Sequence, residues 1–205
     1  MNFTFGIVTI YDNLTQLSQV IDSIRDLKIE NYEIIVVGDR DYESLEDTRF
    51  INMGIEREYV TNKKNKIAEL AKFENLVIIH DYYVFDKDWY NGYLSFGNDW
   101  DVCSNPQYLI NGKRHFTDWV IWDDPELPRY TSLDYDDWTK TKYMYQSGGY
   151  MLVKKDFLLK YPCKLNQKWG TAEDVEWSLR MRDHARWKCN KLSSVKHNKV
   201  HRDAR

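Results

Sequence analysis

Three short apolar runs mark the first 85 positions of the chain. They are FTFGIVTI at 3–10, EIIVVGD at 33–39 and NLVIIHD at 75–81, and polar residues stand at the end of each run or just after it. Uninterrupted apolar runs of this length, rich in β-branched residues, predict strands that are covered on both faces. We therefore expect these three segments to be strands of a buried, mostly parallel sheet.

Helical spacing appears between these predicted strands. An apolar stripe follows the first one and predicts a helix with Asp12 or Asn13 as its N-cap. The stripe consists of Leu14, Leu17, Ile21 and Ile24. A second helix is expected from Asn62, as its cap, to about Phe73, after a short strand at 56–60. The alternation of strand and helix with short connections predicts an α/β fold built from βαβ units.

The second half of the chain has a different character. Residues 98–147 are rich in Asp, Trp, Tyr, Asn and Pro, with a turn signal at Asn111–Gly112. The segment 148–155 (GGYMLVKK) returns to strand character, and a helix is expected from about Thr171 to Arg186. We find no repeat and no linker, so a single domain over residues 1–205 is expected.

Composition narrows the classes of partner. The net charge is −3, from 29 basic and 32 acidic residues, whereas a duplex-DNA binder carries a basic excess, so no nucleic-acid partner is expected. The chain has 8 Trp, 15 Tyr and 8 Phe residues. Flat rings with a polar tip suit sugar faces and nucleobases, although ordinary packing also accounts for them.

Targeting signals and cysteine pattern indicate the expected compartment. The start MNFTFGIVTIYDN lacks a basic region, and its apolar stretch ends at Asp12, which is typical of a buried strand and not of a signal peptide. No apolar run reaches the roughly 18 residues of a transmembrane span. The cysteines, Cys103, Cys163 and Cys189, have no CxxC spacing and are expected to be reduced thiols. We therefore expect a soluble cytoplasmic protein without a transmembrane segment.

Polar residues at the ends of the predicted strands are the first candidates for chemistry. Ligands of open α/β sheets bind beyond the carboxyl ends of the strands. Here these ends carry Thr9 and Tyr11, Asp39, and the pair His80–Asp81. TIYDN stands where a dinucleotide-binding protein has GxGxxG, which disfavours a dehydrogenase. Asp39 fits a contact to a base or ribose, or a simple turn residue.

Carboxylates and one histidine supply the remaining candidates. Asp81 at a strand end is placed to hold a divalent cation against a diphosphate. Glu173 and Asp174 stand at the expected start of a helix, where Thr171 and Asp174 resemble a capping box. The same position suits a carboxylate that accepts a proton. His197 is either a metal ligand or a surface residue.

Taken together, these segments resemble the GT-A glycosyltransferases. The first half, with its VVGD strand end, the Lys-Asn-Lys helix start and VIIHDYYVF, is similar to the family-2 type. In the second half, SGGYMLVKKDF, WGTAEDVEWSLR and CNKLSSVKH follow the order seen in polypeptide GalNAc-transferases and β-1,4-galactosyltransferases. The resemblance implies one GT-A domain, in which residues 1–97 bind a nucleotide sugar and residues 98–205 form the acceptor and catalytic half.

The resemblance also implies roles for individual residues. Asp174 is expected to be the catalytic base, with Glu173 beside it on the acceptor, which Trp169 also contacts. Asp81 and His197 are the expected ligands of Mn²⁺ or Mg²⁺. The residues expected at the UDP-sugar donor are Thr9, Tyr11, Asp39, Asn65, Lys66, His80, Gly148 and Gly149.

The sequence departs from the GT-A pattern at two places. His80-Asp81-Tyr82 stands where the family has its DXD metal motif, and Thr171-Ala172 replaces the middle glycine of WGGED. The expected reaction is metal-dependent, inverting transfer of a sugar to the hydroxyl of a saccharide or glycan acceptor. A retaining transferase without a protein base and a non-catalytic carbohydrate-binding protein are the alternatives. A nucleotidyltransferase is disfavoured, because no Gly-rich basic loop is present to hold a triphosphate.

Overall fold

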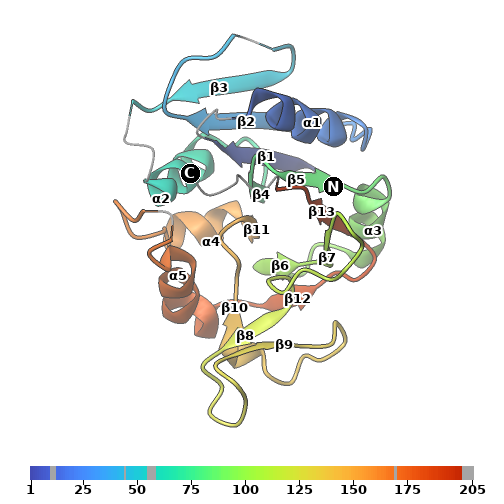
Figure 1. Cartoon of the computed structure of the whole chain (residues 1–205), viewed down its shortest axis with the longest axis vertical. Helices are drawn as coiled ribbons and strands as arrows, with labels where there is room; N and C mark the ends of the chain where they lie inside the picture. The colour runs from blue at the N-terminus through green and yellow to red at the C-terminus, as the bar shows by residue number, and fades with distance from the viewer. Residues whose placement is uncertain (10–12, 44, 55–58, 169, 200–205) are drawn as a thin grey trace.

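A seven-stranded sheet runs through the centre of the molecule (Figure 1). The computed structural model describes residues 1–9, 13–43, 45–54, 59–168 and 170–199. The strand order is β12-β6-β11-β4-β1-β2-β3. The strands of this sheet are β1 (Phe3–Val8), β2 (Tyr32–Gly38), β3 (Thr48–Asn52), β4 (Asn75–His80), β6 (Val102–Ser104), β11 (Tyr150–Lys154) and β12 (Trp187–Cys189).

The direction of the strands determines where a ligand site can form. β1 pairs in parallel with β2 and β4, and β2 pairs in parallel with β3. β11 is antiparallel to β4, with Tyr150 opposite Ile79. The carboxyl ends of β1, β2 and β4 therefore meet the amino end of β11 at one edge of the sheet. This mostly parallel α/β sheet confirms the predicted fold class.

Helices cover both faces of the sheet (Figure 1). They are α1 (Leu14–Arg25), α2 (Val60–Leu70), α3 (Trp89–Phe96), α4 (Lys155–Lys160) and α5 (Glu173–Met181), with 3₁₀ turns at Thr141–Tyr143 and Arg182–His184. One core joins alternate side chains of β1, such as Phe3 and Phe5, to α1 and α3. A second core on the opposite face joins Ile35 and Val37 to α2, α4 and α5. Burial on both faces explains why these strands are continuously apolar in sequence.

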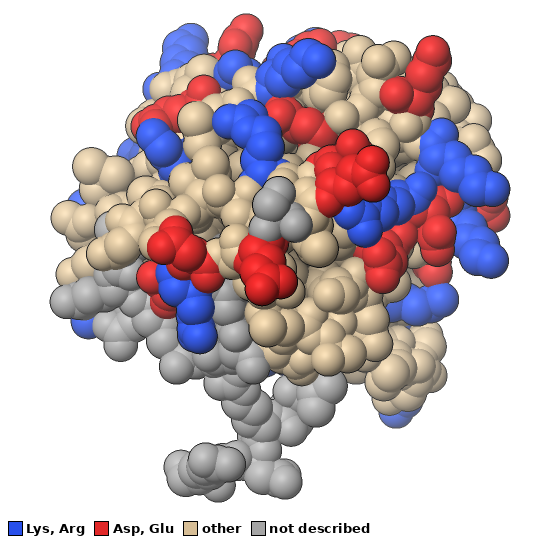
Figure 2. Space-filling view, turned by 90° about the horizontal axis from the view of Figure 1, so that it is seen from above, with Lys and Arg blue, Asp and Glu red and all other residues tan. Residues whose placement is uncertain are grey.

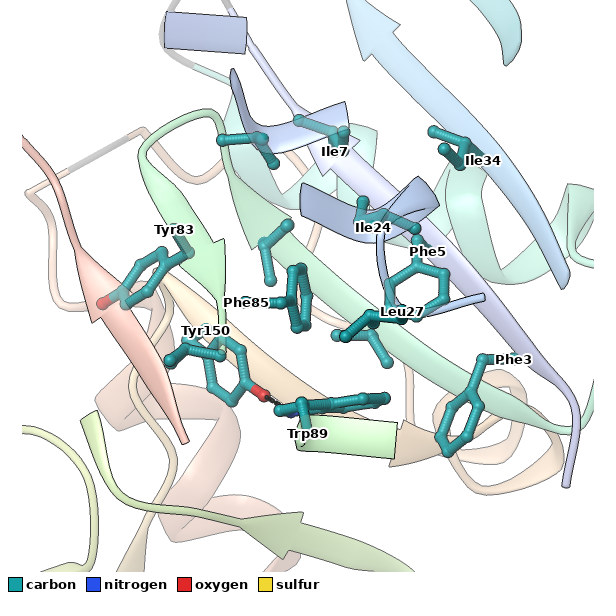
Figure 3. Close-up of a cluster of buried hydrophobic side chains, with 14 of the residues drawn as sticks. Phe3, Phe5, Ile7, Ile24, Leu27, Ile34, Tyr83, Phe85, Trp89 and Tyr150 are labelled. Carbon is teal, nitrogen blue, oxygen red and sulfur yellow. Dashed lines mark hydrogen bonds between the residues drawn. The ribbon is translucent and has the colours of Figure 1, made fainter. Parts of the chain in front are cut away.

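Aromatic rings fill the first of these cores (Figure 3). The ring centroids of Phe5 and Phe85 lie 5.3 Å apart, and those of Phe3 and Trp89 lie 5.0 Å apart, both in edge-to-face arrangements. The indole Nε1 of Trp89 donates a 3.0 Å hydrogen bond to the hydroxyl of Tyr150. Because Tyr150 begins β11, this contact ties the aromatic core to the edge of the sheet where the strand ends meet.

Two small sheets flank the central one. The first has the order β10-β8-β9 and lies at the bottom of Figure 1, and the second has the order β5-β13-β7. Their strands are β5 (Tyr83–Phe85), β7 (Gln107–Leu109), β8 (Val120–Trp122), β9 (Tyr130–Ser132), β10 (Met144–Tyr145) and β13 (Val195–His197). β13 pairs with β5, so it lies beside the segment that leaves the end of β4.

Several local expectations hold and others need correction. Asn13 is the N-cap of α1, and its side chain accepts a 3.0 Å hydrogen bond from Gln16 N. Asn62 is not a cap, because α2 already begins at Val60, and its side chain bonds Asn166 instead. Val60 is therefore helical and not part of a strand at 56–60, of which residues 56–58 lie outside the described part of the chain.

Charge and cysteines complete this description. Figure 2 shows acidic and basic side chains interspersed on the face seen from above. Cys103, Cys163 and Cys189 are buried free thiols. Within the described ranges, no helix combines the length and the apolar character that crossing a membrane requires.

Candidate functional site

The carboxyl ends of β1 and β4 are joined through side chains. The hydroxyl of Thr9 donates a hydrogen bond to Oδ2 of Asp81, so the residues that follow the two strands are held together. The backbone carbonyl of Thr9 in turn accepts a 2.9 Å hydrogen bond from Nζ of Lys63. The structure thus brings two of the predicted site residues, Thr9 and Asp81, into contact.

Two buried lysines approach this edge from α2. Lys63 and Lys64 lie on the buried stripe of the helix. They follow Val60 by three and four residues, and they precede Ile67 by four and three residues. Both side chains are buried, which is rare for lysine and requires a compensating partner or ligand. Lys63 was missed in the sequence, and Lys64, the first residue of the Lys-Asn-Lys helix start, was given no role at the site. Their position on an apolar stripe at helical spacing is the signal that could have identified them.

Lys64 forms a buried ion pair with the first acid of α5. Its Nζ lies 3.4 Å from Oε1 of Glu173, and both side chains are almost completely buried. A Cβ at Gly148 would lie 2.7 Å from Oε1 of Glu173 and 3.0 Å from Nζ of Lys64. Gly148 therefore leaves room for this pair. Glu173 points inward in this arrangement, and its contact to an acceptor stays a prediction.

The second acid of α5, Asp174, is held from three directions. Oδ2 accepts a 2.5 Å hydrogen bond from the hydroxyl of Tyr145 and a 2.9 Å bond from the backbone N–H of Gly148. Oδ1 accepts a 2.9 Å bond from the backbone N–H of Val175. A carboxylate has about four acceptor positions, so about one remains for a further partner. Tyr145 is a second residue that the sequence did not reveal.

The start of α5 differs from the predicted capping box. The N-cap is Ala172, which lies in the left-handed region with φ 58° and has no side-chain cap hydrogen bond. The hydroxyl of Thr171 donates instead to the carbonyl of Lys168. Because the side chain of Asp174 bonds Tyr145 of β10 and Gly148 in the turn before β11, it is unavailable as a box partner. A left-handed alanine is strained, and such strain is frequent at functional sites.

His80 ends β4 as a neutral imidazole. Burial, followed by the positive charge of Lys64, lowers the pKa of His80 to about 3. Its Nδ1 lies 2.9 Å from the hydroxyl of Tyr82, whose pKa is raised by burial, so the phenol carries the proton. The buried Nε2 of His80 has no hydrogen-bond partner among the described residues. The backbone N–H of His80 donates to the carbonyl of Gly149, which holds β11 against this strand end.

Asp39 stands at the carboxyl end of β2. Its Oδ1 is buried and has no hydrogen-bond partner in the described part of the chain, and Nε of Arg40 is 3.9 Å away. A buried carboxylate oxygen without a donor is costly unless a ligand supplies one. Asp39 is therefore open to a donor group such as a base N–H or a ribose hydroxyl.

Four predicted residues are placed differently or are not described. The side chain of Asn65 exchanges hydrogen bonds with the backbone of Cys163, and Lys66 pairs with Glu69 on the outer face of α2. Neither contact leads to the strand ends. Tyr11 and Trp169 lie outside the described residues.

His197 approaches the strand ends from β13. It lies opposite Tyr83 in the β5–β13 register, and its ring contacts those of Tyr82 and Tyr83. The ring of His115 stacks on it, with centroids 4.6 Å apart and planes at 14°. Nδ1 of His115 bonds the hydroxyl of Thr117 at 2.6 Å. This stack fixes the plane of the His197 imidazole.

The donor set limits how a cation can be held. Asp81 and His197 provide a carboxylate and an imidazole, which suit Mn²⁺. Elsewhere in the described ranges, as here, no group of three His, Cys, Asp or Glu side chains could hold a metal. Asp81 and His197 as joint ligands of a cation therefore stay a prediction.

Comparison with solved structures identifies the fold. S. aureus TarS 1–349 superposes with a TM-score of 0.71 at 12% identity, over 97% of this chain. The same fragment in complex with UDP-GlcNAc gives 0.71 over 98%. GalNAc-T7 with UDP, GalNAc and Mn²⁺ gives 0.67 at 16% identity over 96%. The chain has the GT-A glycosyltransferase fold.

The GT-A neighbours are longer than this chain. The match covers 60% of the TarS fragment and 43% of GalNAc-T7. Neither the comparison with protein families nor that with curated proteins gives a match. In the GT-A fold described here, the candidate site lies at the edge where β1, β2 and β4 end and β11 begins.

Proposed function

We propose that the chain is a glycosyltransferase that moves a sugar from a UDP-sugar to an acceptor hydroxyl with inversion at the anomeric carbon. The observation that supports this proposal is the position of Asp174, which Tyr145 and Gly148 hold at the edge where β11 begins. The titles of the neighbours support the donor class, because TarS binds UDP-GlcNAc and UDP, and GalNAc-T7 binds UDP.

Unsatisfied polar atoms support a nucleotide-diphosphate ligand at the strand ends. Oδ1 of Asp39 needs a donor, which a uracil N–H or a ribose hydroxyl provides. Nε2 of His80, with its proton, needs an acceptor, which a phosphate oxygen provides. The buried charges of Lys63 and Lys64 act on His80, which places positive charge near this strand end. The combination matches a ligand with a base at one end and a diphosphate at the other.

Asp174 is the proposed general base. The free lone pair of its carboxylate takes the proton from the hydroxyl of the acceptor sugar. The oxygen of that hydroxyl forms a bond to the anomeric carbon as the bond between this carbon and UDP breaks. The electron pair of that bond leaves with UDP, and the proton stays on Asp174. Attack opposite the leaving group inverts the configuration. The bonds from Tyr145 and Gly148 keep the carboxylate in one orientation during this step.

Asp81 and His197 are the proposed protein ligands of Mn²⁺ or Mg²⁺. These two side chains would hold the cation, which when bound would supply positive charge to offset that of a departing diphosphate. Thr9 fixes Asp81 by a hydrogen bond, and His115 fixes His197 by stacking. These two contacts orient the ligands before the donor arrives.

Two alternatives make different demands on the site. A retaining transferase without a protein base would leave Asp174 as a structural residue that holds Tyr145 and Gly148. A carbohydrate-binding protein would bind glycan without UDP or metal, and it would not need a buried pair such as Lys64–Glu173 at the strand ends. The acceptor in our proposal is a saccharide or glycan.

A thermal-shift experiment tests the donor class. UDP with Mn²⁺ should raise the melting temperature, and EDTA should remove that gain, because a ligand that binds the folded state stabilises it by mass action. Asp39→Ala should weaken the UDP effect. CDP and GDP at equal concentration serve as controls for base selectivity. No stabilisation by UDP, with or without Mn²⁺, would contradict the proposal.

A further inference from the structure

A row of aromatic rings leads away from Asp174 across the small sheet β10-β8-β9. It consists of Tyr145, Trp122, Tyr130 and Phe116, which we call the aromatic wall. The ring centroids of Tyr145 lie 5.9 Å from those of both Trp122 and Tyr130, and Tyr130 lies 5.8 Å from Phe116. The pairing of β8 with β10 and β9, in which Trp122 is opposite Tyr130, places these rings together.

Both ends of the aromatic wall touch residues of the candidate site. At one end the hydroxyl of Tyr145 donates to Asp174. At the other end the ring of Phe116 lies 4.7 Å from that of His115, which stacks on His197. The hydroxyl of Tyr130 donates to the carbonyl of Phe116 and fixes the loop that carries it. The wall therefore runs between the proposed base and the proposed metal ligand.

The aromatic wall offers both apolar surface and polar atoms. Phe116 is 63% exposed, although its neighbour His115 is buried. Nε1 of Trp122 is a buried donor with no hydrogen-bond partner in the part of the chain described here. The guanidinium of Arg129 lies 4.8 Å from the Trp122 ring centroid and remains largely exposed, paired with Asp123 at 3.2 Å.

We propose that the aromatic wall binds a pyranose ring of the acceptor and directs its hydroxyl to Asp174. This inference rests on the proposed glycosyl transfer and adds the residues that recognise the acceptor. A pyranose presents a flat C–H face and a rim of hydroxyls. The C–H face matches the exposed ring of Phe116 and the edge of Tyr130, and a hydroxyl oxygen satisfies Nε1 of Trp122.

The polar atoms distinguish a sugar from other occupants of an apolar surface. An amphipathic helix requires a groove of aliphatic pockets. Here single rings alternate with an unpaired indole N–H, a guanidinium and the Asp174 carboxylate. A ligand hydroxyl supplies an acceptor to Nε1 of Trp122, whereas a purely apolar ligand would leave this buried donor without a partner.

Saturation-transfer NMR with defined sugars tests the proposal. The probes are the methyl glycosides of glucose, galactose, mannose and N-acetylglucosamine, measured with the whole chain in the presence of UDP and Mn²⁺. At least one glycoside should bind. Phe116→Ala should raise its dissociation constant about tenfold, the effect of losing a central aromatic contact. Trp122→Phe keeps an aromatic ring without the N–H donor and should also weaken binding.

Leu94→Ala is the matched control, because Leu94 is 49% exposed on α3, away from the aromatic wall. It should leave glycoside binding unchanged, and melting temperatures should show that all variants fold. Binding of no glycoside, or equal binding by Phe116→Ala, would overturn the proposal. So would binding of a serine- and threonine-containing peptide library that Phe116→Ala abolishes, because the acceptor would then be a peptide. UDP-dependent stabilisation, measured separately, reports on the donor function alone.

Discussion

The hydroxyl of Tyr145 donates a 2.5 Å hydrogen bond to Oδ2 of Asp174. The two residues belong to different elements, β10 and α5, and are 29 positions apart in the sequence. Burial and the charge of Asp174 raise the pKa of Tyr145, so its hydroxyl stays protonated and remains a donor. This contact sets the orientation of the proposed base.

Tyr145→Phe removes this hydrogen bond and keeps the ring. A hydrogen bond to a charged group contributes about 1.5 to 3 kcal/mol, so we expect the turnover of UDP-sugar to fall at least about tenfold. Turnover is measured as UDP release. Tyr143→Phe, in the neighbouring 3₁₀ turn, is the control and should retain activity. Unchanged turnover in Tyr145→Phe would mean that this contact does not position the base.

The buried pair Lys64–Glu173 predicts a large effect on stability. Lys64→Met leaves Glu173 as a buried charge without its partner, and the free energy of unfolding should fall by about 3 to 5 kcal/mol. Lys66→Met, which breaks the exposed pair with Glu69 on the same helix, should change it by no more than about 1 kcal/mol. Urea denaturation measures both.

A double variant separates the ion pair from general damage to the core. Lys64→Met combined with Glu173→Leu removes both charges and should be more stable than Lys64→Met alone. The single variant Glu173→Leu completes the cycle. If the loss of stability in the double variant equalled the sum of the losses in the two single variants, Lys64 and Glu173 would not be coupled.

Replacement of Ala172 by glycine should increase the stability of the fold. The φ of 58° at Ala172 is unfavourable for any residue with a Cβ, by roughly 1 to 2 kcal/mol, and part of this is offset by the greater freedom of glycine in the unfolded chain. Ala172→Gly should raise the free energy of unfolding by up to about 1 kcal/mol. Ala185→Gly, where φ is −105°, should lower it. Equal changes in the free energy of unfolding for the two glycine variants would show that the backbone at Ala172 is not strained.

If Asp81 and His197 bind the same cation, loss of either side chain should increase the Mn²⁺ concentration that the enzyme requires. Asp81→Asn and His197→Ala should each raise the Mn²⁺ concentration for half-maximal activity at least about tenfold. Asp99→Asn, at an exposed carboxylate paired with Arg186, is the control. A normal Mn²⁺ requirement in either site variant would remove that residue from the proposed metal site.

The long strands of the central sheet were predictable because strands buried on both faces appear in the sequence as continuous apolar runs. The side chains of Ile7 and Val8 in β1 face opposite cores, so a continuous apolar run is the expected pattern. β3 was not anticipated, because this edge strand, TRFIN, has few buried side chains and no apolar run. The predicted start of α2 at Asn62 was wrong because Asn62 bonds Asn166, a contact 104 positions away.

The candidate site was predictable only in part. Thr9, Asp39, His80 and Asp81 stand at strand ends, where the fold class itself places ligands. The Lys-Asn-Lys motif predicts Asn65 and Lys66 at the donor, but the buried face of α2 carries Lys63 and Lys64 instead. Nothing local to Tyr145 indicates its contact with Asp174, because that contact depends on the pairing of β10 with β8 and on the position of α5.

Asp174→Asn tests the central claim most directly. The amide keeps the size of the side chain, and its oxygen can still accept from Tyr145 and Gly148. Only the bond from the Val175 N–H is lost, so the fold and UDP affinity should stay near those of the unchanged chain. Glu176→Gln, at a partly exposed carboxylate of the same helix that pairs with Arg180, is the matched control. If Asp174 takes the proton of the acceptor hydroxyl, UDP release from the UDP-sugar should fall by about 10²-fold or more in Asp174→Asn and stay normal in Glu176→Gln. Turnover within a few-fold of the unchanged chain in Asp174→Asn would contradict the inverting mechanism.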